Sequence, residues 1–468
     1  EKFKGAHVKE PQVGKFKYVC SFDLASLYPS LIRTYNISPE TLIKDRNHYV
    51  SIDTIIDEEF TIKPEHSNYS ICPNGSMYSK EKQGFLPKIM EKMFNERSVY
   101  KKKMLHCQSL NEVNPSEKLE EEISMYKNYQ QALKICLNSA FGSLGNEYFR
   151  FYDIRNAEAI TYSGQAVIRW IEKKLNSYLN KISGTKDVDM ILAMDTDSAF
   201  LHFEPIVKKV FEGKNPSEEK IINFLMKVCD GVMQEFIDKS FNELCDITNA
   251  YQNCLHMKRE KICSSALWRK KKNYILNVWD NEGVRYAEPK IKMSGIEAVR
   301  TSTPAYCRVA IKNAIEIIMN GEEEEIIKFI DKTRKEFFNL SSEEIAFPRS
   351  ASNIQKFYSY HSIYGKSTPM HIRGCLLFNH YVKENNLTYK YSLIQNGEKI
   401  KYVYLKKPNP IHENVISFIQ TLPKELKLDK YIDYDLQFEK SFLDPLRSIL
   451  DIIGWNIEKV STLDAFFS

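Results

Sequence analysis

The sequence lacks the cysteine spacing of a zinc or disulfide protein. None of its ten cysteines forms a C-x-x-C pair, the spacing that is typical of zinc knuckles. No signal-peptide pattern opens the sequence, and disulfide bonds are expected mainly in secreted proteins. We therefore predict reduced cysteines that mostly pack in the protein core.

Long apolar runs are also missing. No stretch approaches the roughly 18 apolar residues of a membrane-spanning helix, and 27% of the 468 residues are charged. Internal repeats and low-complexity segments are absent as well. These features exclude a membrane protein and predict a soluble, intracellular protein. Because the chain exceeds the size of a single core, we expect roughly two to four subdomains.

A large net charge is missing too, since the formal net charge is only +5. Basic residues are nevertheless clustered at 101–103, 208–209, 269–272 and 399–407. Such clusters usually form solvated surfaces. Several clusters flanked by aromatic residues also suit a nucleic-acid backbone.

One carboxylate is predicted at the end of a strand. An apolar run over 18–22 leads to Asp23, after which small and polar residues lead to Pro29. The run predicts a strand, and Pro29 favours an extended or turning residue before it. A single aspartate in this position is more often a turn former or a helix N-cap than a ligand.

Two more aspartates occupy the tip of a predicted β-hairpin. Asp195 and Asp197 lie between the apolar runs 190–194 and 199–203, and charges in that position must be solvated, paired or metal-bound. If the strands are neighbours, these carboxylates and Asp23 converge at one sheet edge, where they can hold two oxygen-preferring cations. Two such ions are a known arrangement for in-line phosphoryl transfer.

Two helices joined by a polar turn at 114–116 are expected over 87–142. Residues at i,i+4 spacing share one face of a helix, and a triphosphate would need such cationic and amide groups around it. Any such pair on its own is more typical of an ordinary helix surface. The residues concerned are Arg97, Lys101, Lys134, Asn138 and Phe141.

The remaining pattern predicts mainly helices after an irregular or β-rich segment over 42–80. A composition shift after Gly295 predicts a domain boundary, and a basic cluster leads into an aromatic strand over 268–279. Helices are expected over residues 156–179, 216–246, 305–320 and 322–338.

Four motifs together resemble those of the family B DNA polymerases. They follow the order and roughly the spacing of that family: Asp-Leu-Ala-Ser-Leu-Tyr-Pro-Ser at 23–30, Lys-Ile-Cys-Leu-Asn-Ser-Ala-Phe-Gly at 134–142, Asp-Thr-Asp-Ser at 195–198 and Lys-Lys-Lys-Asn-Tyr at 270–274. Further matches, such as Arg-Tyr-Ala-Glu-Pro-Lys at 285–290, are similar to the replicative enzymes of T-even-type bacteriophages. The resemblance covers essentially the whole chain.

The resemblance implies an α+β fold of the right-hand polymerase type and DNA-directed DNA synthesis by two-metal-ion nucleotidyl transfer. The implied domains are an antiparallel-sheet palm (1–86 and 147–296), helical-hairpin fingers (87–146) and a mainly helical thumb with a clamp-binding tail (297–468). The implied partners are primer–template DNA, dNTPs and a sliding clamp, without a membrane. A naturally split polymerase would also have a separate exonuclease chain as partner, and a fragment of a longer enzyme fits the sequence equally well. The implied location is the cytoplasm of an infected bacterial host.

The resemblance also assigns residue roles. Two Mg²⁺ ions, for which Mn²⁺ can substitute, would be bound by Asp23, Asp197 and the Leu24 carbonyl, with Asp195 in a secondary catalytic role. Tyr28 would exclude a ribose 2′-hydroxyl. Nucleotide binding is implied for Ser26, Leu27, Tyr28, Arg97, Lys101, Lys134 and Asn138, DNA binding for Phe141, Gly142, Lys271, Lys272 and Tyr274, and clamp binding for Leu463, Phe466 and Phe467.

The sequence departs from the family pattern at two positions near the expected site. Ala193-Met194 replaces the usual Tyr-Gly before Asp195, and Phe141 replaces a tyrosine. The second change removes a hydroxyl that could bond in the minor groove, so we expect weaker checking of the nascent base pair. Only 22 residues precede Asp23, which predicts that a 3′–5′ exonuclease domain is missing from this chain.

Three alternatives remain open on the sequence. The protein could be a non-catalytic, polymerase-derived DNA-binding or assembly subunit, although such a subunit would not need a complete set of carboxylates and cations. It could also be a protein-primed enzyme, although the compact chain leaves little room for the insertions of that subgroup. The apolar tail could pack on its own domain instead of a clamp.

Overall fold

A six-stranded sheet organises the first part of the chain in the computed structural model, which describes residues 5 and 7–456. Its strand order is β5-β6-β1-β7-β8-β9, and β5, β6, β1, β7 and β8 pair antiparallel with their neighbours. The strands are β1 (Gly14–Leu24), β5 (Ile191–Asp195), β6 (Ser198–His202), β7 (Met257–Lys270), β8 (Asn273–Asn281) and β9 (Val284–Ser294). The sheet brings Asp23 next to the Asp195–Asp197 hairpin although they are far apart in sequence.

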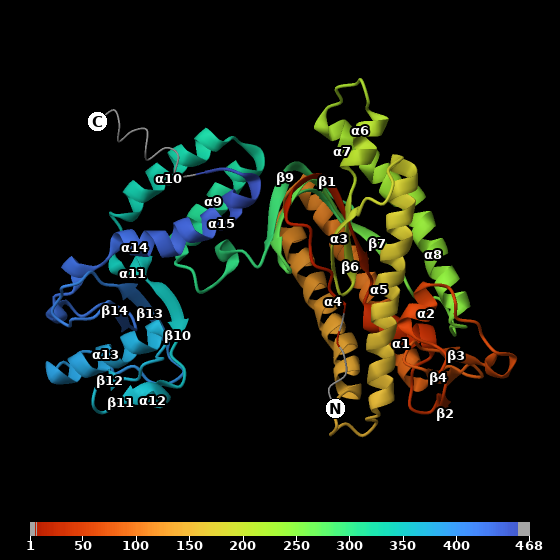
Figure 1. Cartoon of the computed structure of the whole chain (residues 1–468), viewed down its shortest axis with the longest axis horizontal. Helices are drawn as coiled ribbons and strands as arrows, with labels where there is room; N and C mark the ends of the chain where they lie inside the picture. Colours follow the sequence, from red (N-terminus) through yellow and green to blue (C-terminus); the bar gives the residue numbers. More distant parts are fainter. Residues whose placement is uncertain (1–4, 6, 457–468) are drawn as a thin grey trace. The chain divides into compact units, whose positions relative to one another are not determined.

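Helices cover this sheet and extend from it, as Figure 1 shows for the long pair α3 and α4 that lie side by side. Their apolar positions recur at helical spacing, and Ser116 caps α4 by accepting a hydrogen bond from the Leu119 N–H. The helices are α1 (Leu27–Tyr35), α2 (Ile52–Ile56), α3 (Phe85–Val113), α4 (Glu117–Leu144), α5 (Ile154–Ser183), α6 (Glu204–Val210), α7 (Glu218–Val228) and α8 (Gln234–Ile247). The expected helical hairpin is therefore present.

Most strands of the six-stranded sheet carry buried side chains on both faces, whereas β9 is largely half-buried or exposed. On one face, side chains of β1, β5 and β6 join α1, α5 and α8 in the larger core. On the other, Phe200, Trp268 and Tyr274 belong to a smaller cluster against which Leu105 of α3 packs. A separate three-stranded sheet fills the β-rich segment, with β2 (Leu42–Arg46), β3 (Tyr69–Ile71) and β4 (Ser76–Ser79) in the order β2-β4-β3.

Glu1–Lys292 and Met293–Ser468 form two compact units. The second unit contains the expected helices α9 (Ala305–Asn320) and α10 (Glu323–Phe337), and it also contains a three-stranded sheet in the order β10-β13-β14. Its other elements are α11 (Ser342–Ile345), β10 (Phe347–Ser350), α12 (Ile354–Phe357), β11 (Tyr358–Ser359), β12 (Ile363–Tyr364), α13 (Met370–Glu384), β13 (Lys399–Tyr404), β14 (Val415–Phe418), α14 (Tyr434–Phe438) and α15 (Asp444–Ile453).

The α+β prediction is confirmed, because helices and an antiparallel sheet occupy separate segments. All ten cysteines are free and only Cys136 is exposed, which confirms the prediction of reduced, mostly buried thiols. The expected turn up to Pro29 is wrong, because α1 already begins at Leu27. Pro29 lies in the first turn of this helix, where the missing N–H breaks no intrahelical hydrogen bond.

Candidate active site

Asp23 lies at the end of β1, directly beside the hairpin of β5 and β6. It is paired with Ser198 of β6, and the Leu24 N–H donates a hydrogen bond to the Asp197 carbonyl at 2.8 Å. The hairpin turns through Thr196, which has a left-handed φ of +59°, an uncommon conformation for a non-glycine residue. These constraints hold Asp23 and Asp197 at one edge of the sheet, as the sequence predicts.

The two carboxylates share a partly desolvated, negatively charged environment. Burial, followed by the charges of Asp197 and Glu260, raises the pKa of Asp23 to about 7. Burial also raises the pKa of Asp197, while the nearby Lys134 charge opposes this rise. Because like charges and burial both disfavour ionisation, a bound cation would stabilise this pair.

The carboxylates fit a cation site that is completed by a substrate. Within the described residues, no three His, Cys, Asp or Glu side chains are grouped closely enough to hold a metal ion on their own. Proteins usually bind Mg²⁺ through one or two carboxylates, with waters and substrate phosphates completing its shell. Two carboxylates such as Asp23 and Asp197 match what a phosphate-bound Mg²⁺ takes from a protein.

The segment after Asp23 turns sharply into the N-terminus of α1. Ser26 has a left-handed φ of +51°, and its hydroxyl accepts a hydrogen bond from Arg97 Nη1 at 3.0 Å instead of capping the helix. The first N–H groups of an α-helix have no intrahelical acceptor, so a helix N-terminus favours anions. Leu27 and Tyr28 therefore present N–H groups suited to phosphate oxygens.

A cavity of about 300 Å³ brings this segment together with cations of α3 and α4. One wall carries the carboxylates and the start of α1, and the other carries basic and amide side chains. The lining residues are Asp23, Leu24, Ala25, Ser26, Leu27, Tyr28, Arg97, Lys101, Lys134, Asn138, Phe141, Thr196 and Asp197. Every residue that the sequence assigns to metal or nucleotide binding thus lines one cavity.

Tyr28 packs between α4 and α5 at the edge of this cavity. Its ring centroid lies 4.4 Å from that of Phe141. On the other side, a Cβ atom added to Gly164 would lie 3.3 Å from Tyr28 Cε1. The lack of a side chain at Gly164 therefore makes room for the Tyr28 ring.

The structure does not bring every predicted residue into the cavity. Asp195 faces Lys272, with Oδ1 and Nζ 3.5 Å apart, and Lys271 pairs with Glu10 at 2.8 Å. Tyr274 packs near Phe200 and Trp268 in the smaller core cluster. Gly142 lies near the end of α4, and the predicted clamp-binding residues Leu463, Phe466 and Phe467 lie outside the described residues.

Sequence reasoning missed the third acidic residue of this region, Glu260 on β7. Its charge raises the pKa of both Asp23 and Asp197, and its carboxylate pairs with Lys261 at 2.5 Å. A signal was present, because Lys258–Lys261 is a charged run inside a strand that is otherwise largely buried. These four residues are exposed or half-buried, and charges that lose part of their contact with water require partners.

Comparisons with known proteins agree with these motifs. The family model described as DNA polymerase family B matches residues 1–453. The DNA-directed DNA polymerases of Enterobacteria phage T4 and Escherichia phage RB69 are 33% and 34% identical, over 100% and 99% of this chain. DNA polymerase 1 of Pyrococcus abyssi is 25% identical over 98% of the chain and 48% of its own length. The chain spans 57% of the length of each phage relative.

Proposed function

The chain belongs to DNA polymerase family B, and from this premise we propose that it extends a primer on a DNA template by two-metal-ion nucleotidyl transfer. The observation that carries the proposal is the cavity in which two carboxylates face the cations of α3 and α4. Such a pairing suits the attack of a hydroxyl on a triphosphate, because the carboxylates would hold cations and the basic side chains would bind phosphates. We also assign to the chain the role of replicating a phage genome, by analogy with its phage relatives.

Asp23 and Asp197 would hold the metal ions, with the Leu24 carbonyl as an additional ligand. When bound, two Mg²⁺ ions, or Mn²⁺ in their place, would increase the nucleophilicity of the primer 3′-hydroxyl and stabilise charge on the leaving pyrophosphate. The two carboxylates would hold these ions at the end of β1, next to the start of α1. Asp195 lies outside the cavity and acts through its negative charge near Asp197.

The triphosphate would lie between α1 and the two long helices. Arg97 offers a planar fork of donors, Lys101 and Lys134 offer point charges, and Asn138 adds a neutral donor. From the opposite wall, Ser26, Leu27 and Tyr28 would contribute the helix N-terminus. These groups would neutralise charge that the metal ions leave uncovered.

The Tyr28 ring would exclude ribonucleotides by filling the space of a 2′-hydroxyl. Phe141 supports this ring from α4 and, together with Gly142, would face the nascent base pair. Lys271 and Lys272, in the turn between β7 and β8, would bind the DNA backbone electrostatically, with Tyr274 anchoring the turn in the aromatic cluster.

The domain names follow the same proposal. Residues 1–86 and 147–296 would form the palm, 87–146 the fingers and 297–468 the thumb. Leu463, Phe466 and Phe467 would bind a sliding clamp, so that replacing both phenylalanines by alanine should reduce processivity only when a clamp is present.

Within the described residues, no helix is both long and apolar enough to cross a membrane.

The alternative is a polymerase-derived subunit that binds DNA without synthesis. The experiment that separates the two is primer extension by the purified chain with a primed template, four dNTPs and Mg²⁺, alongside a measurement of primer–template binding. The polymerase proposal predicts extension that disappears on chelation of the metal. DNA binding without extension would overturn it in favour of the assembly subunit.

A further inference from the structure

The turn between β8 and β9 contains a residue in an unfavourable conformation. Glu282 and Gly283 alone connect the two strands, and both have left-handed φ values, +54° and +87°. Two-residue turns of this kind favour Asn-Gly or Asp-Gly, because a longer side chain is disfavoured at positive φ. Such an outlier is a reason to look for a function of the glutamate side chain.

The turn is fixed against the sheet by its backbone. The Glu282 N–H donates a hydrogen bond to the Glu260 carbonyl at 2.5 Å. The Gly283 N–H donates another to Asp280 Oδ1 at 3.0 Å. These bonds hold Glu282 beside β7, the strand that carries Glu260.

The Glu282 carboxylate reaches a cation of the nucleotide cavity. It forms an ion pair with Lys101 Nζ, and the two side chains are only 26% and 33% exposed. It also acts on Arg97: burial lowers the pKa of this guanidinium, and the charge of Glu282, followed by that of Asp23, opposes the shift. Glu282 is therefore the counter-ion of Lys101, which lines the cavity together with Arg97.

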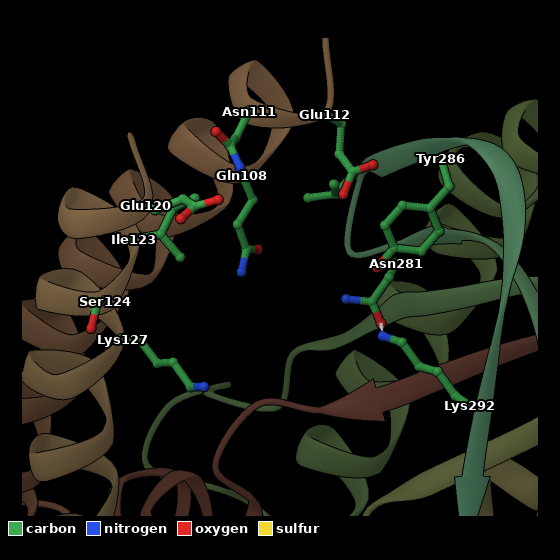
Figure 2. Close-up of a pocket in the computed structure, with 11 residues that line it drawn as sticks. Gln108, Asn111, Glu112, Glu120, Ile123, Ser124, Lys127, Asn281, Tyr286 and Lys292 are labelled. Atoms are coloured by element: carbon green, nitrogen blue, oxygen red, sulfur yellow. Dashed lines mark hydrogen bonds between the residues drawn. The ribbon is translucent and has the colours of Figure 1, made fainter. Parts of the chain in front are cut away.

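A second ion pair between the same elements lies outside that cavity. Glu112 near the end of α3 binds Lys290 of β9 at 2.5 Å. Between this pair and the turn, the helices and strands are separated by a polar cavity of about 420 Å³, whose wall includes Glu112 and Asn281 (Figure 2). Glu112 thus offers a matched carboxylate that joins α3 to the β8–β9 hairpin without contacting Lys101.

We propose that Glu282 is a positioning residue that takes the place of the triphosphate: in the nucleotide-free protein its carboxylate holds Lys101, and a bound triphosphate must displace it. The inference rests on the proposed function, because it assumes that Lys101 binds the nucleotide. A triphosphate carries more negative charge than one carboxylate, so it wins this competition. Any phosphate ligand of Lys101 must displace the carboxylate, so the turn weakens the binding of tripolyphosphate and of pyrophosphate alike.

The test measures binding of inorganic tripolyphosphate and of inorganic pyrophosphate to the whole chain, together with the KM and kcat of dNTP incorporation. Glu282→Gln removes the charge and keeps the side-chain length, Glu282→Asn removes the charge and suits the turn, and Glu282→Asp retains the charge. Glu112→Gln is the matched control. Because a part-buried ion pair contributes on the order of 1 kcal/mol, the neutral variants should bind both phosphates about two- to tenfold more tightly.

The expected result is that both neutral variants lower the dNTP KM with little change in kcat, while Glu282→Asp and Glu112→Gln stay close to the wild type. Unchanged phosphate binding in both neutral variants would overturn the inference. An equal gain in Glu112→Gln would also overturn it, because loosening α3 would then explain the effect. If the wild type bound tripolyphosphate as expected but never extended a primer, the proposed function would fail while the role of Glu282 stood.

Discussion

At the scale of single residues, the site depends on two residues whose backbone conformation turns the chain. Thr196 and Ser26 both have left-handed φ values, and they turn the chain so that Asp197 and the start of α1 face one cavity. No residue pattern in the sequence predicts these two backbone conformations. The sequence motifs predict the side chains that line the cavity, but the turns that orient them are visible only in the fold.

Gly164 provides a test of how Tyr28 is positioned. In Gly164→Ala, the new Cβ would lie 3.3 Å from Tyr28 Cε1, a contact that forces the ring toward the cavity. We expect a dNTP KM several-fold higher, with a smaller change in kcat, because the ring would intrude on the sugar of the nucleotide.

The matched control is Gly231→Ala, since no atom lies within 4 Å of a Cβ added at Gly231. Steady-state incorporation of a single dNTP and of the matching ribonucleotide measures the changes in KM and kcat. Equal KM values in the wild type and Gly164→Ala would contradict the packing described for Tyr28.

At the scale of secondary-structure elements, helices with regular apolar spacing were predictable and short irregular ones were not. The sequence predicts breaks near 114–116 and helices near 156–179, and the structure has α4 from Glu117 and α5 over Ile154–Ser183. In contrast, α1 was missed because Pro29 is read as a helix breaker, although a helix tolerates proline in its first turn. The sheet of the second unit was missed because its strands are short and are separated by long segments.

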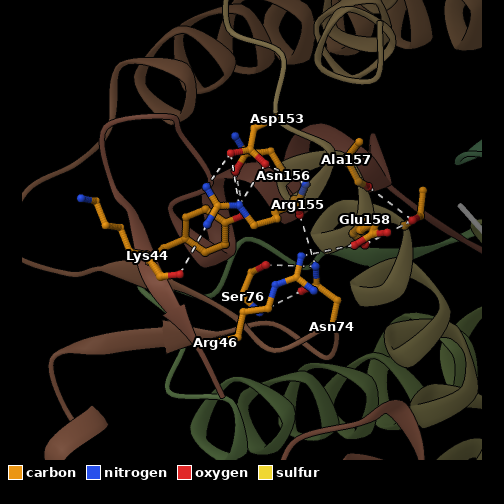
Figure 3. A network of polar contacts seen from close by, with 11 residues as sticks. Lys44, Arg46, Asn74, Ser76, Asp153, Arg155, Asn156, Ala157 and Glu158 are labelled. Carbon is orange, nitrogen blue, oxygen red and sulfur yellow. Dashed lines mark hydrogen bonds and ion pairs between the residues drawn. The ribbon is translucent and has the colours of Figure 1, made fainter. Parts of the chain in front are cut away.

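The start of α5 is stabilised by a polar network that also contacts the β2–β4 sheet (Figure 3). Asp153 caps the helix by accepting from the Arg155 N–H at 2.9 Å, and its carboxylate binds the Arg155 guanidinium. Arg155 Nη1 also donates to the Lys44 carbonyl. This network matters for the site because α5 carries Gly164 against Tyr28.

Asp153 makes the stability of this region depend on pH. The hydrogen bonds from Arg155 hold the pKa of Asp153 below its usual range. Because the folded-state pKa is the lower one, the stabilisation is present above the unfolded value of about 3.9 and is lost as the pH falls through the folded value. We expect Asp153→Asn, which keeps a cap acceptor, to be less stable than the wild type at pH 7.

The difference between Asp153→Asn and the wild type should shrink as the pH falls toward about 3. Urea denaturation at both pH values measures it, and Asp45→Asn serves as the control, because Asp45 is an exposed aspartate of β2. A stability difference that does not vary with pH would show that the ionised carboxylate is not what stabilises the helix start.

At the scale of the whole molecule, the two compact units predict unfolding in more than one step. Each unit has its own buried side chains, such as Trp170 in the first and Phe438 in the second. Multidomain proteins commonly violate two-state behaviour. We expect differential scanning calorimetry to give a calorimetric enthalpy clearly larger than the van't Hoff enthalpy, and equal enthalpies would contradict the division at Lys292.

The central claim is that Asp23 and Asp197 hold the metal ions for primer extension. The most direct test is single-turnover incorporation of one dNTP in Mg²⁺ by the wild type, Asp23→Asn, Asp197→Asn and the control Asp53→Asn, whose aspartate is 73% exposed on α2. We expect each site variant to lose at least about a thousandfold in rate, because removing a group that stabilises developing charge costs several kcal/mol. The control should retain the wild-type rate and all variants should bind primer–template. Site variants as fast as the control would contradict the claim.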